Sequence, residues 1–390
     1  MINFEYYAPT RVVFGKNAEC GVASLIKEYS AKKVLVVYGG KSAIRSGLLD
    51  RVCTSLKDAG LEYVTMGGVQ PNPRLSKVYE GIELSRRENV DFLLAVGGGS
   101  VIDTCKAIGA GLEYSGDVWD LYIGKAVCQG SAPVGCVLTL SATGSEMSNG
   151  SVITNDENLL KRSFDSNYCQ CKFAVMNPEI TYSLPRYQTA SGCVDIIMHT
   201  LERYLSVEGF DITDSIAEAI VRNIIKYSVI ALEDPDCYEA RANIMWAGSL
   251  SHNGLTGCGT VGDWAPHMIE HELGGMFDVT HGAGLSAIWG SWARYVMDVK
   301  PSRFAQLARN VFQIEGSDDT DTALRGICAM EDYFRSVEMP TTLKELGIEP
   351  TADQIGELAD KCCDGDTHTV GHFRALKSAD VKAILLAARG

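Results

Sequence analysis

Three of the chain's seven histidines lie close together in the stretch PHMIEHELGGMFDVTHG, residues 266–282. His267 and His271 are four residues apart, so in a helix both side chains project from one face. His281 lies just beyond them and precedes a glycine at an expected helix start. Grouped imidazoles of this kind can bind a divalent metal ion. The first half of the stretch also reads H-x-x-E-H, the pattern of one class of zinc peptidases that use the glutamate as general base.

An aspartate and a histidine with the same spacing occur earlier, in VDIIMHTLE, as Asp195 and His199. Most other side chains of this stretch are apolar, and a buried aspartate or histidine is costly unless it is paired or bound to a metal. One such pair alone is typical of a solvated helix face. Two pairs together with His281 favour a metal site instead, because one carboxylate and several imidazoles suit a first-row divalent ion.

Two glycine turns in the first half of the chain have the composition of a phosphate-binding site. VGGGSVIDTCKAIG, residues 96–109, places three glycines between a strand and a helix. Glycines let the backbone approach a ligand, and a helix start offers free N–H groups and a positive dipole end. The spacing is not G-x-G-x-x-G, so the usual dinucleotide fingerprint is absent. A tight turn alone would explain this stretch, but a second glycine turn, YGGKSAIRSG at residues 38–47, favours nucleotide binding. The candidate contacts in the two turns are Gly97, Gly98, Gly99 and Ser100, and Gly39, Gly40, Lys41, Ser42 and Arg45.

The second turn also bears on the choice of dinucleotide. An acidic residue on the ribose is typical of NAD sites, whereas a basic residue suits the 2′-phosphate of NADP. There is no carboxylate between Val36 and Ser46, and two cations lie in the turn. We therefore expect NADP(H), with NAD(H) as the alternative. A third stretch, TLSATGSE at residues 139–146, is either an ordinary turn or a further contact through Thr139, Ser141 and Thr143.

The elements that must position these residues change type midway along the chain. Buried strand patterns at 32–40, 61–69, 91–100 and 132–146 alternate with helical patterns at 48–60 and 75–90. This alternation predicts a Rossmann-like α/β domain with a parallel sheet over residues 1–185, binding its ligand at the carboxyl ends of the strands. Helical periodicity then dominates, at 188–206, 212–233, 238–255 and 302–312. We expect an all-helical metal and substrate domain over residues 186–390.

Composition narrows the partners and the compartment. Hydrophobic residues make up 46% of the chain and no apolar run reaches the roughly 20 residues that span a bilayer. A net charge of −14 and a pI near 5.0 argue against nucleic acid or an anionic membrane as partner. The start of the chain lacks the pattern of a secretory signal. Thirteen irregularly spaced cysteines without a C-x-x-C indicate reduced thiols in a cytoplasm.

Taken together, these motifs resemble the iron-dependent (group III) alcohol dehydrogenases, and most of all their butanol dehydrogenase and NADPH-dependent aldehyde reductase branch. The resemblance covers nearly the whole chain. It is carried by stretches such as GGVQPNPRLSKVYEG, AVGGGSVIDTCKAI, SATGSEMSNGSVIT, SGCVDIIMHTLERYL and GDWAPHMIEHELGGMFDVTHGAGLSAI. It implies an NADP(H)-linked oxidoreductase acting on short- to medium-chain primary alcohols and aldehydes, and a homodimer.

The resemblance also implies a set of site residues. The metal, Fe(II) or Zn(II), would be held by Asp195, His199, His267 and His281. His271 would face the nicotinamide and substrate as proton relay, and Glu270 would lie on the helix surface or behind the ligands. The GGGS turn would bind the pyrophosphate, with Asp103 on the helix behind it as a cofactor contact and catalytic candidate. Further cofactor-lining positions are Asn72, Thr139, Thr143 and Lys161.

Three other readings compete with this one. A zinc peptidase built on His267, Glu270 and His271 would leave the glycine turns and Asp195 without a purpose. A metal-dependent lyase of the dehydroquinate synthase type, or a polyol dehydrogenase, would share the GGGS turn and differ in net cofactor turnover. A metal- or nucleotide-binding protein without catalysis would leave the grouped donors unexplained.

Overall fold

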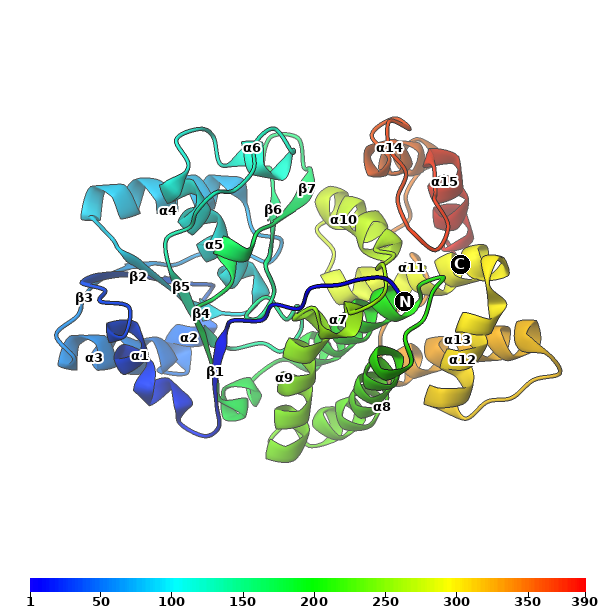
Figure 1. Ribbon diagram of the computed structural model, residues 1–390, viewed down its shortest axis with the longest axis horizontal. Helices are drawn as coiled ribbons and strands as arrows, with labels where there is room; N and C mark the ends of the chain where they lie inside the picture. The colour runs from blue at the N-terminus through cyan, green and yellow to red at the C-terminus, as the bar shows by residue number, and fades with distance from the viewer. The chain divides into compact units, whose positions relative to one another are not determined.

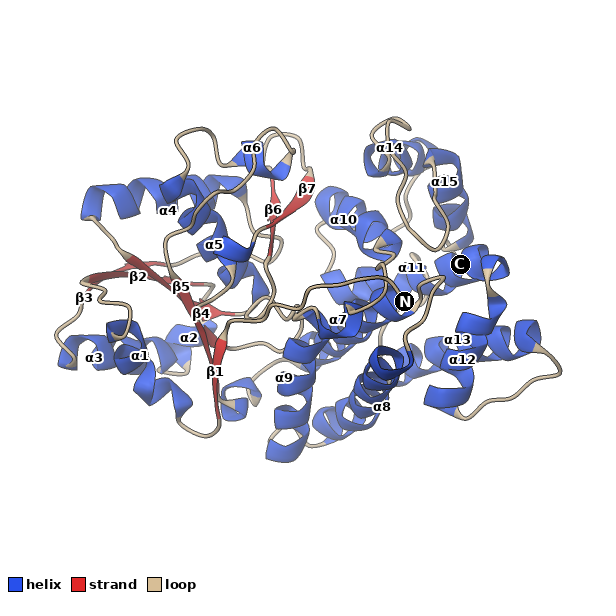
Figure 2. Ribbon diagram, viewed as in Figure 1, coloured by secondary structure: helices blue, strands red, loops and turns tan.

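The computed structural model describes all residues, 1–390, which separate into two compact units. Residues Ala8–Leu184 form an α/β unit, and Met1–Tyr7 join Pro185–Gly390 in a helical unit. Figure 1 colours the chain from blue at the N-terminus to red at the C-terminus, and Figure 2 shows that the strands occur in the α/β unit. No helix has both the length and the apolar character needed to cross a membrane.

The first seven residues correct the predicted division, which assigned them to the α/β domain. The backbone N–H of Ile2 donates to the carbonyl of Gly259 at 3.0 Å. The Met1 ammonium lies 3.2 Å from a Glu208 carboxylate oxygen, and the ring of Phe4 lies 6.4 Å from that of Phe210. These partners are more than two hundred residues away, and a segment this short has no periodicity that would reveal them.

The α/β unit is built on the predicted parallel sheet. Six strands pair in parallel in the order β1-β8-β5-β4-β2-β3. Their bounds are β1 Arg11–Phe14, β2 Lys33–Tyr38, β3 Glu62–Met66, β4 Phe92–Gly97, β5 Val134–Leu138 and β8 Phe173–Met176. The central strands are continuous aliphatic runs because helices cover both faces of such a sheet. A separate antiparallel pair, β6 Gly150–Thr154 and β7 Lys161–Asp165, was not predicted.

Amphipathic helices close the faces of the sheet. In α3, residues Leu48, Val52 and Leu56 follow one another at four-residue spacing and are at most 1% exposed. Burying each such side chain stabilises the fold by about 1.5–3 kcal/mol. The helices of this unit are α1 Val22–Lys27, α2 Ser42–Arg45, α3 Leu48–Asp58, α4 Leu75–Glu88, α5 Gly99–Glu113 and α6 Trp119–Tyr122, with 3-10 turns at Ala18–Gly21, Asn167–Cys169 and Pro178–Thr181.

The strand order creates a switch point between β2 and β4. These two strands are neighbours, but the chain continues from β2 outward to β3 and from β4 outward to β5 on the other side. Connections that leave in opposite directions open a crevice at the carboxyl ends of the two strands, where open α/β sheets bind their ligands. The two glycine turns begin at these ends, since β2 stops at Tyr38 and β4 at Gly97.

The helical unit packs around two buried helices, α7 and α11. In α7 every residue from Thr189 to Tyr204 is buried, and α11 contributes Trp289 and Trp292, both fully buried. A helix that is buried on all sides lies in the middle of a bundle. The helices are α7 Arg186–Tyr204, α8 Asp211–Glu233, α9 Tyr238–His252, α10 Ala265–Phe277, α11 His281–Val296, α12 Pro301–Phe312, α13 Asp319–Ser336, α14 Ala352–Cys362 and α15 Ser378–Ala387, with 3-10 turns at Leu255–Gly257 and Met297–Val299.

Candidate active site

Polar donors cluster on the buried helix α7. Asp195 and His199 are 2% and 4% exposed, and the distance from Asp195 Oδ1 to His199 Nδ1 is 3.6 Å. Their four-residue spacing brings both side chains to one face, as the sequence indicated. Polar atoms so deeply buried need partners, because leaving one unpaired costs about 1–3 kcal/mol.

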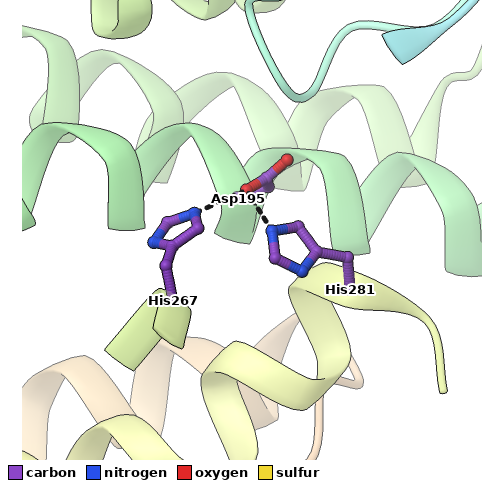
Figure 3. A group of neighbouring side chains, drawn as sticks. All are labelled: Asp195, His267 and His281. Atoms are coloured by element: carbon purple, nitrogen blue, oxygen red, sulfur yellow. Dashed lines mark ion pairs between the residues drawn. The ribbon is translucent and has the colours of Figure 1, made fainter. Parts of the chain in front are cut away.

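Two more helices bring histidines to the same carboxylate. His267 lies in the first turn of α10, and His281 is the first residue of α11. Figure 3 shows both rings pointing at Asp195. His267 Nε2 and His281 Nε2 are each 3.6 Å from Asp195 Oδ1. Three imidazole nitrogens therefore surround one carboxylate oxygen at equal distance.

Close packing of α11 on α7 makes this arrangement possible. A Cβ added at Gly282, the residue after His281, would lie 2.0 Å from the carbonyl oxygen of Ser191 on α7. Real Cβ contacts essentially never approach below 3.0 Å. Only glycine lets the first turn of α11 come this near, and so places His281 beside Asp195.

The spacing of the donor atoms fits a divalent metal ion. Around a tetrahedral ion bound at about 2.1 Å, neighbouring ligand atoms lie about 3.4 Å apart, and each of the three nitrogens here lies 3.6 Å from Asp195 Oδ1. The ligand atoms of Asp195, His267 and His281 all lie within 4.8 Å of one another, whereas His199 lies outside that group. Asp195 Oδ1, His199 Nδ1 and His267 Nε2 are buried and have no hydrogen-bond partner. Lone pairs that face one another in a dry site repel unless a cation lies between them. The residues present therefore fit a metal.

The surroundings of the cluster shift the pKa values of two of its histidines in opposite directions. Burial lowers the pKa of His199 well below its usual value, and the neighbouring His252 and His267 lower it further. Burial also lowers the pKa of His267, but Glu202 and Asp195 outweigh it and raise the pKa to about 9. The carboxylates thus favour positive charge at the centre of the cluster, whether a proton or a metal ion supplies it.

Two further carboxylates lie behind the histidines. Glu202 Oε1 is 2.5 Å from His267 Nδ1, and Glu270 Oε2 is hydrogen-bonded to His281 Nδ1. Both glutamate side chains are fully buried, so of the two places expected for Glu270 the helix surface is ruled out. Sequence reasoning missed Glu202, although it follows Asp195 and His199 at i+7 and i+3 on the same helix face.

His271 lies one helical turn after His267 and is 7% exposed. Its ring centroid is 5.9 Å from that of His281 and 6.4 Å from that of His267. Glu270, His271 and His281 form a second group of possible metal donors. We favour the group around Asp195, because a direct hydrogen bond joins Glu270 to His281 and leaves no room for an ion between them.

One histidine and one tryptophan lie beside the cluster without being candidate ligands. The His252 ring lies 4.0 Å from that of His199, edge to face. Trp264, just before α10, adopts the left-handed conformation at φ 63° and lies 5.4 Å from the His267 ring. A bulky residue with positive φ is strained, and such strain occurs preferentially at functional sites. Sequence reasoning missed His252, which has no spacing motif that would have marked it.

Three predicted cofactor turns come together at the carboxyl ends of neighbouring strands β2, β4 and β5. The backbone N–H of Thr139 donates to the Gly97 carbonyl at 3.0 Å. A Cβ at Gly99 would lie 2.3 Å from Thr143 Oγ1, so the turn at residues 96–109 touches the stretch at residues 139–146. At Gly40, in contrast, a Cβ would meet nothing within 4 Å.

The remaining cofactor candidates differ in exposure. Lys41, Ser42 and Arg45 are exposed, and Gly39 leads into their turn. Ser100, in the first turn of α5, and Gly98 before it are half-buried. Ser141 is 9% exposed and its hydroxyl has no hydrogen-bond partner, so it is available to a ligand. Asn72, at φ 51°, and Lys161, at the start of β7, are 8% and 5% exposed.

Asp103 on α5 is 8% exposed, and its carboxylate is hydrogen-bonded within the α/β unit. Its Oδ1 accepts from the Ser145 hydroxyl at 2.5 Å, and its Oδ2 accepts from the Val152 backbone N–H at 3.1 Å. Burial raises the pKa of this carboxyl, against the opposing effect of Lys106 and of these donors. The arrangement ties the segment 145–152 to α5, and the predicted catalytic part for Asp103 stays a prediction.

Known proteins resemble this chain over its whole length. Residues 9–178 match the family described as iron-containing alcohol dehydrogenase, and residues 189–389 match the C-terminal part of the Fe-containing alcohol dehydrogenase family. NADH-dependent butanol dehydrogenase A of Clostridium acetobutylicum is 41% identical, covering 98% of this chain and 99% of its own. NADPH-dependent aldehyde reductase YqhD of Escherichia coli is 39% identical, covering 90% of each chain. The crystal structure of NADH-dependent butanol dehydrogenase A from Thermotoga maritima superposes with a TM-score of 0.96 at 38% identity, covering 100% and 99% of the two chains.

Proposed function

The chain belongs to the iron-containing alcohol dehydrogenase family, and we propose that it interconverts short- to medium-chain primary alcohols and aldehydes with NADP(H). The observation that carries the proposal is the set of three imidazole nitrogens at 3.6 Å from Asp195 Oδ1. Of these atoms, Asp195 Oδ1, His199 Nδ1 and His267 Nε2 have no hydrogen-bond partner. A site for a metal ion that acts as a Lewis acid, together with two glycine turns that can bind a dinucleotide, suits hydride transfer at a carbon bearing oxygen.

Asp195, His199, His267 and His281 are the proposed ligands of Fe(II) or Zn(II). When bound, the cation polarises the substrate oxygen and the dinucleotide carries the hydride. His271 holds the proton that the substrate oxygen gains in reduction or loses in oxidation, since its ring lies next to those of the ligand histidines and an imidazole can serve as general acid and base. Asp195 and His267 are only 2% and 5% exposed, and charge interactions are stronger at buried positions than in water.

The preference for NADP(H) over NAD(H) is argued from the turn after β2. Lys41 and Arg45 are exposed there, and no carboxylate lies between Val36 and Ser46. The relatives divide on this point, since one carries NADH and another NADPH in its name. Turnover efficiency with NADPH and with NADH decides it: we expect the higher kcat/KM with NADPH, and a clear preference for NADH would refute the proposal.

The reaction itself is tested by following NADPH oxidation with a chain-length series of aldehydes, before and after removal of metal by a chelator. We expect activity with simple aldehydes, loss of that activity on stripping, and recovery with Fe(II) or Zn(II). Full activity in a stripped sample, verified by metal analysis, would contradict the mechanism. A homodimer is proposed on the family resemblance alone, and light scattering of the purified protein tests it.

A further inference from the structure

The two glutamates behind the histidines connect the three helices of the cluster. Glu202 on α7 binds His267 on α10, and Glu270 on α10 binds His281 on α11. Each glutamate is fully buried, and each meets the ring nitrogen that faces away from Asp195. The same contact therefore recurs at two independent histidines.

Glu202 holds the start of α10 with three separate contacts. Its Oε1 lies 2.5 Å from His267 Nδ1, and its Oε2 accepts from the His267 backbone N–H at 3.4 Å. Its own backbone carbonyl accepts from the N–H of Asp263 at 2.7 Å, in the segment just before the helix. Both the ring and the backbone of His267 are thereby fixed relative to α7.

Glu270 is held in place by the packing of α11. A Cβ at Gly284 would lie 2.8 Å from Glu270 Cγ, so the glycine leaves the space that the glutamate side chain fills. Two of the first four residues of α11 are thus glycines that face a neighbouring helix, Gly282 toward Ser191 and Gly284 toward Glu270. Glu270 has little freedom to turn away from His281.

The protonation pattern of the rings follows from these contacts. A carboxylate at Nδ1 keeps the ring proton on that nitrogen, so Nε2 carries the lone pair that faces Asp195 Oδ1. The negative charge also makes the imidazole a stronger donor to a cation. We propose that Glu202 and Glu270 are positioning residues that set the orientation, tautomer and metal affinity of His267 and His281. This inference rests on the metal centre proposed above.

The test measures metal affinity directly. Glu202→Gln and Glu270→Gln keep the shape of the side chain and a hydrogen-bond acceptor but remove the charge. Stripped protein is titrated with Zn²⁺ against a chromophoric chelator, and with Co²⁺ to follow its visible ligand-field spectrum. We expect each variant to bind about 10–100-fold more weakly, with an altered Co²⁺ spectrum because the ring is less firmly oriented.

Glu218→Gln is the matched control. Glu218 is 6% exposed in the same unit, where it accepts from Tyr204 Oη at 2.9 Å and from Asn310 Nδ2 at 2.8 Å, and it contacts no imidazole. We expect its zinc affinity to equal that of the unmodified protein. A comparable loss in this control would mean that removing any buried charge loosens the unit, which would overturn a specific role for the two glutamates.

The outcomes separate the two proposals. If the unmodified protein binds neither Zn²⁺ nor Co²⁺, the metal centre itself is wrong. If it binds them and both Gln variants bind as tightly with unchanged spectra, the positioning role is wrong while the metal centre stands. Where circular dichroism shows that a Gln variant is unfolded, the Asp variant replaces it, and the same weakening is expected because the shorter side chain retreats from Nδ1.

Discussion

Replacing Gly282 by alanine perturbs the metal centre through packing alone. The added Cβ would lie 2.0 Å from the Ser191 carbonyl oxygen and 2.8 Å from its carbonyl carbon, and both are backbone atoms that cannot rotate away. An ordinary C···O contact is longer than 3.0 Å, so the first turn of α11 must move by about 1 Å or more. His281 moves with it, away from Asp195 Oδ1.

The size of the effect follows from that displacement. A misplacement of about 1 Å costs on the order of 100-fold in rate when a reacting geometry depends on it. The overpacked contact also costs about 1–3 kcal/mol of stability. We therefore expect G282A to fold, to melt at a lower temperature, to bind zinc more weakly and to lose roughly 100-fold in kcat/KM for aldehyde reduction.

The assay pairs G282A with a second glycine-to-alanine change. Gly356 lies inside α14, and a Cβ there meets nothing within 4 Å. G356A should stabilise the protein by about 0.5–1 kcal/mol, because alanine is the better helix former, and should leave activity unchanged. Unaltered zinc affinity and kcat/KM in G282A would refute the argument that this contact places His281.

Three further predictions concern the chemistry and the stability of the fold. His271→Ala should keep the metal, since His271 is not a proposed ligand, and should lower kcat by about 100-fold or more. Steady-state kinetics and metal analysis test this, and an unchanged kcat or a loss of the metal would contradict it. Asp214→Ala should lower the free energy of unfolding by about 3–5 kcal/mol, measured by denaturant unfolding. The Arg303 guanidinium is buried 2.6 Å from the Asp214 carboxylate and would lose its counter-charge. A loss below about 1 kcal/mol would show that solvent reaches the pair. The backbone N–H of Thr341 lowers the pKa of the Glu345 carboxyl. The ionised carboxylate therefore stabilises the folded protein at pH values above its unfolded-state pKa, near 4.3, and this stabilisation is lost as the pH falls through the lower pKa of the folded state. Glu345→Gln should therefore cost about 0.5 kcal/mol at neutral pH, a difference that disappears in acid, and thermal melts across pH 3–7 would contradict this if the gap stayed constant.

Much of the fold could be read from local patterns. The aliphatic runs that become β2, β4 and β5 and the helical periodicity after residue 186 reflect burial, which leaves a signal within a few residues. The strand order does not, since β1 pairs with β8 through Arg11 and Phe173, far apart in the sequence. The hairpin β6–β7 escaped prediction because β7, with the sequence KRSFD, is mostly polar and has no apolar run.

In the candidate site, too, local spacing in the sequence was informative and the packing of the helices was not predictable. Four-residue spacing in a helix decides that Asp195 and His199 share a face, and likewise His267 and His271, whatever the rest of the chain does. Periodicity says nothing about which face of one helix meets another. The packing of α7, α10 and α11 decided that His267 and His281 meet Asp195 Oδ1 with His199, and that Glu202 and Glu270 lie behind them. Such contacts depend on where a glycine allows two backbones to touch, as at Gly282 and Ser191, and only the folded chain contains that distance.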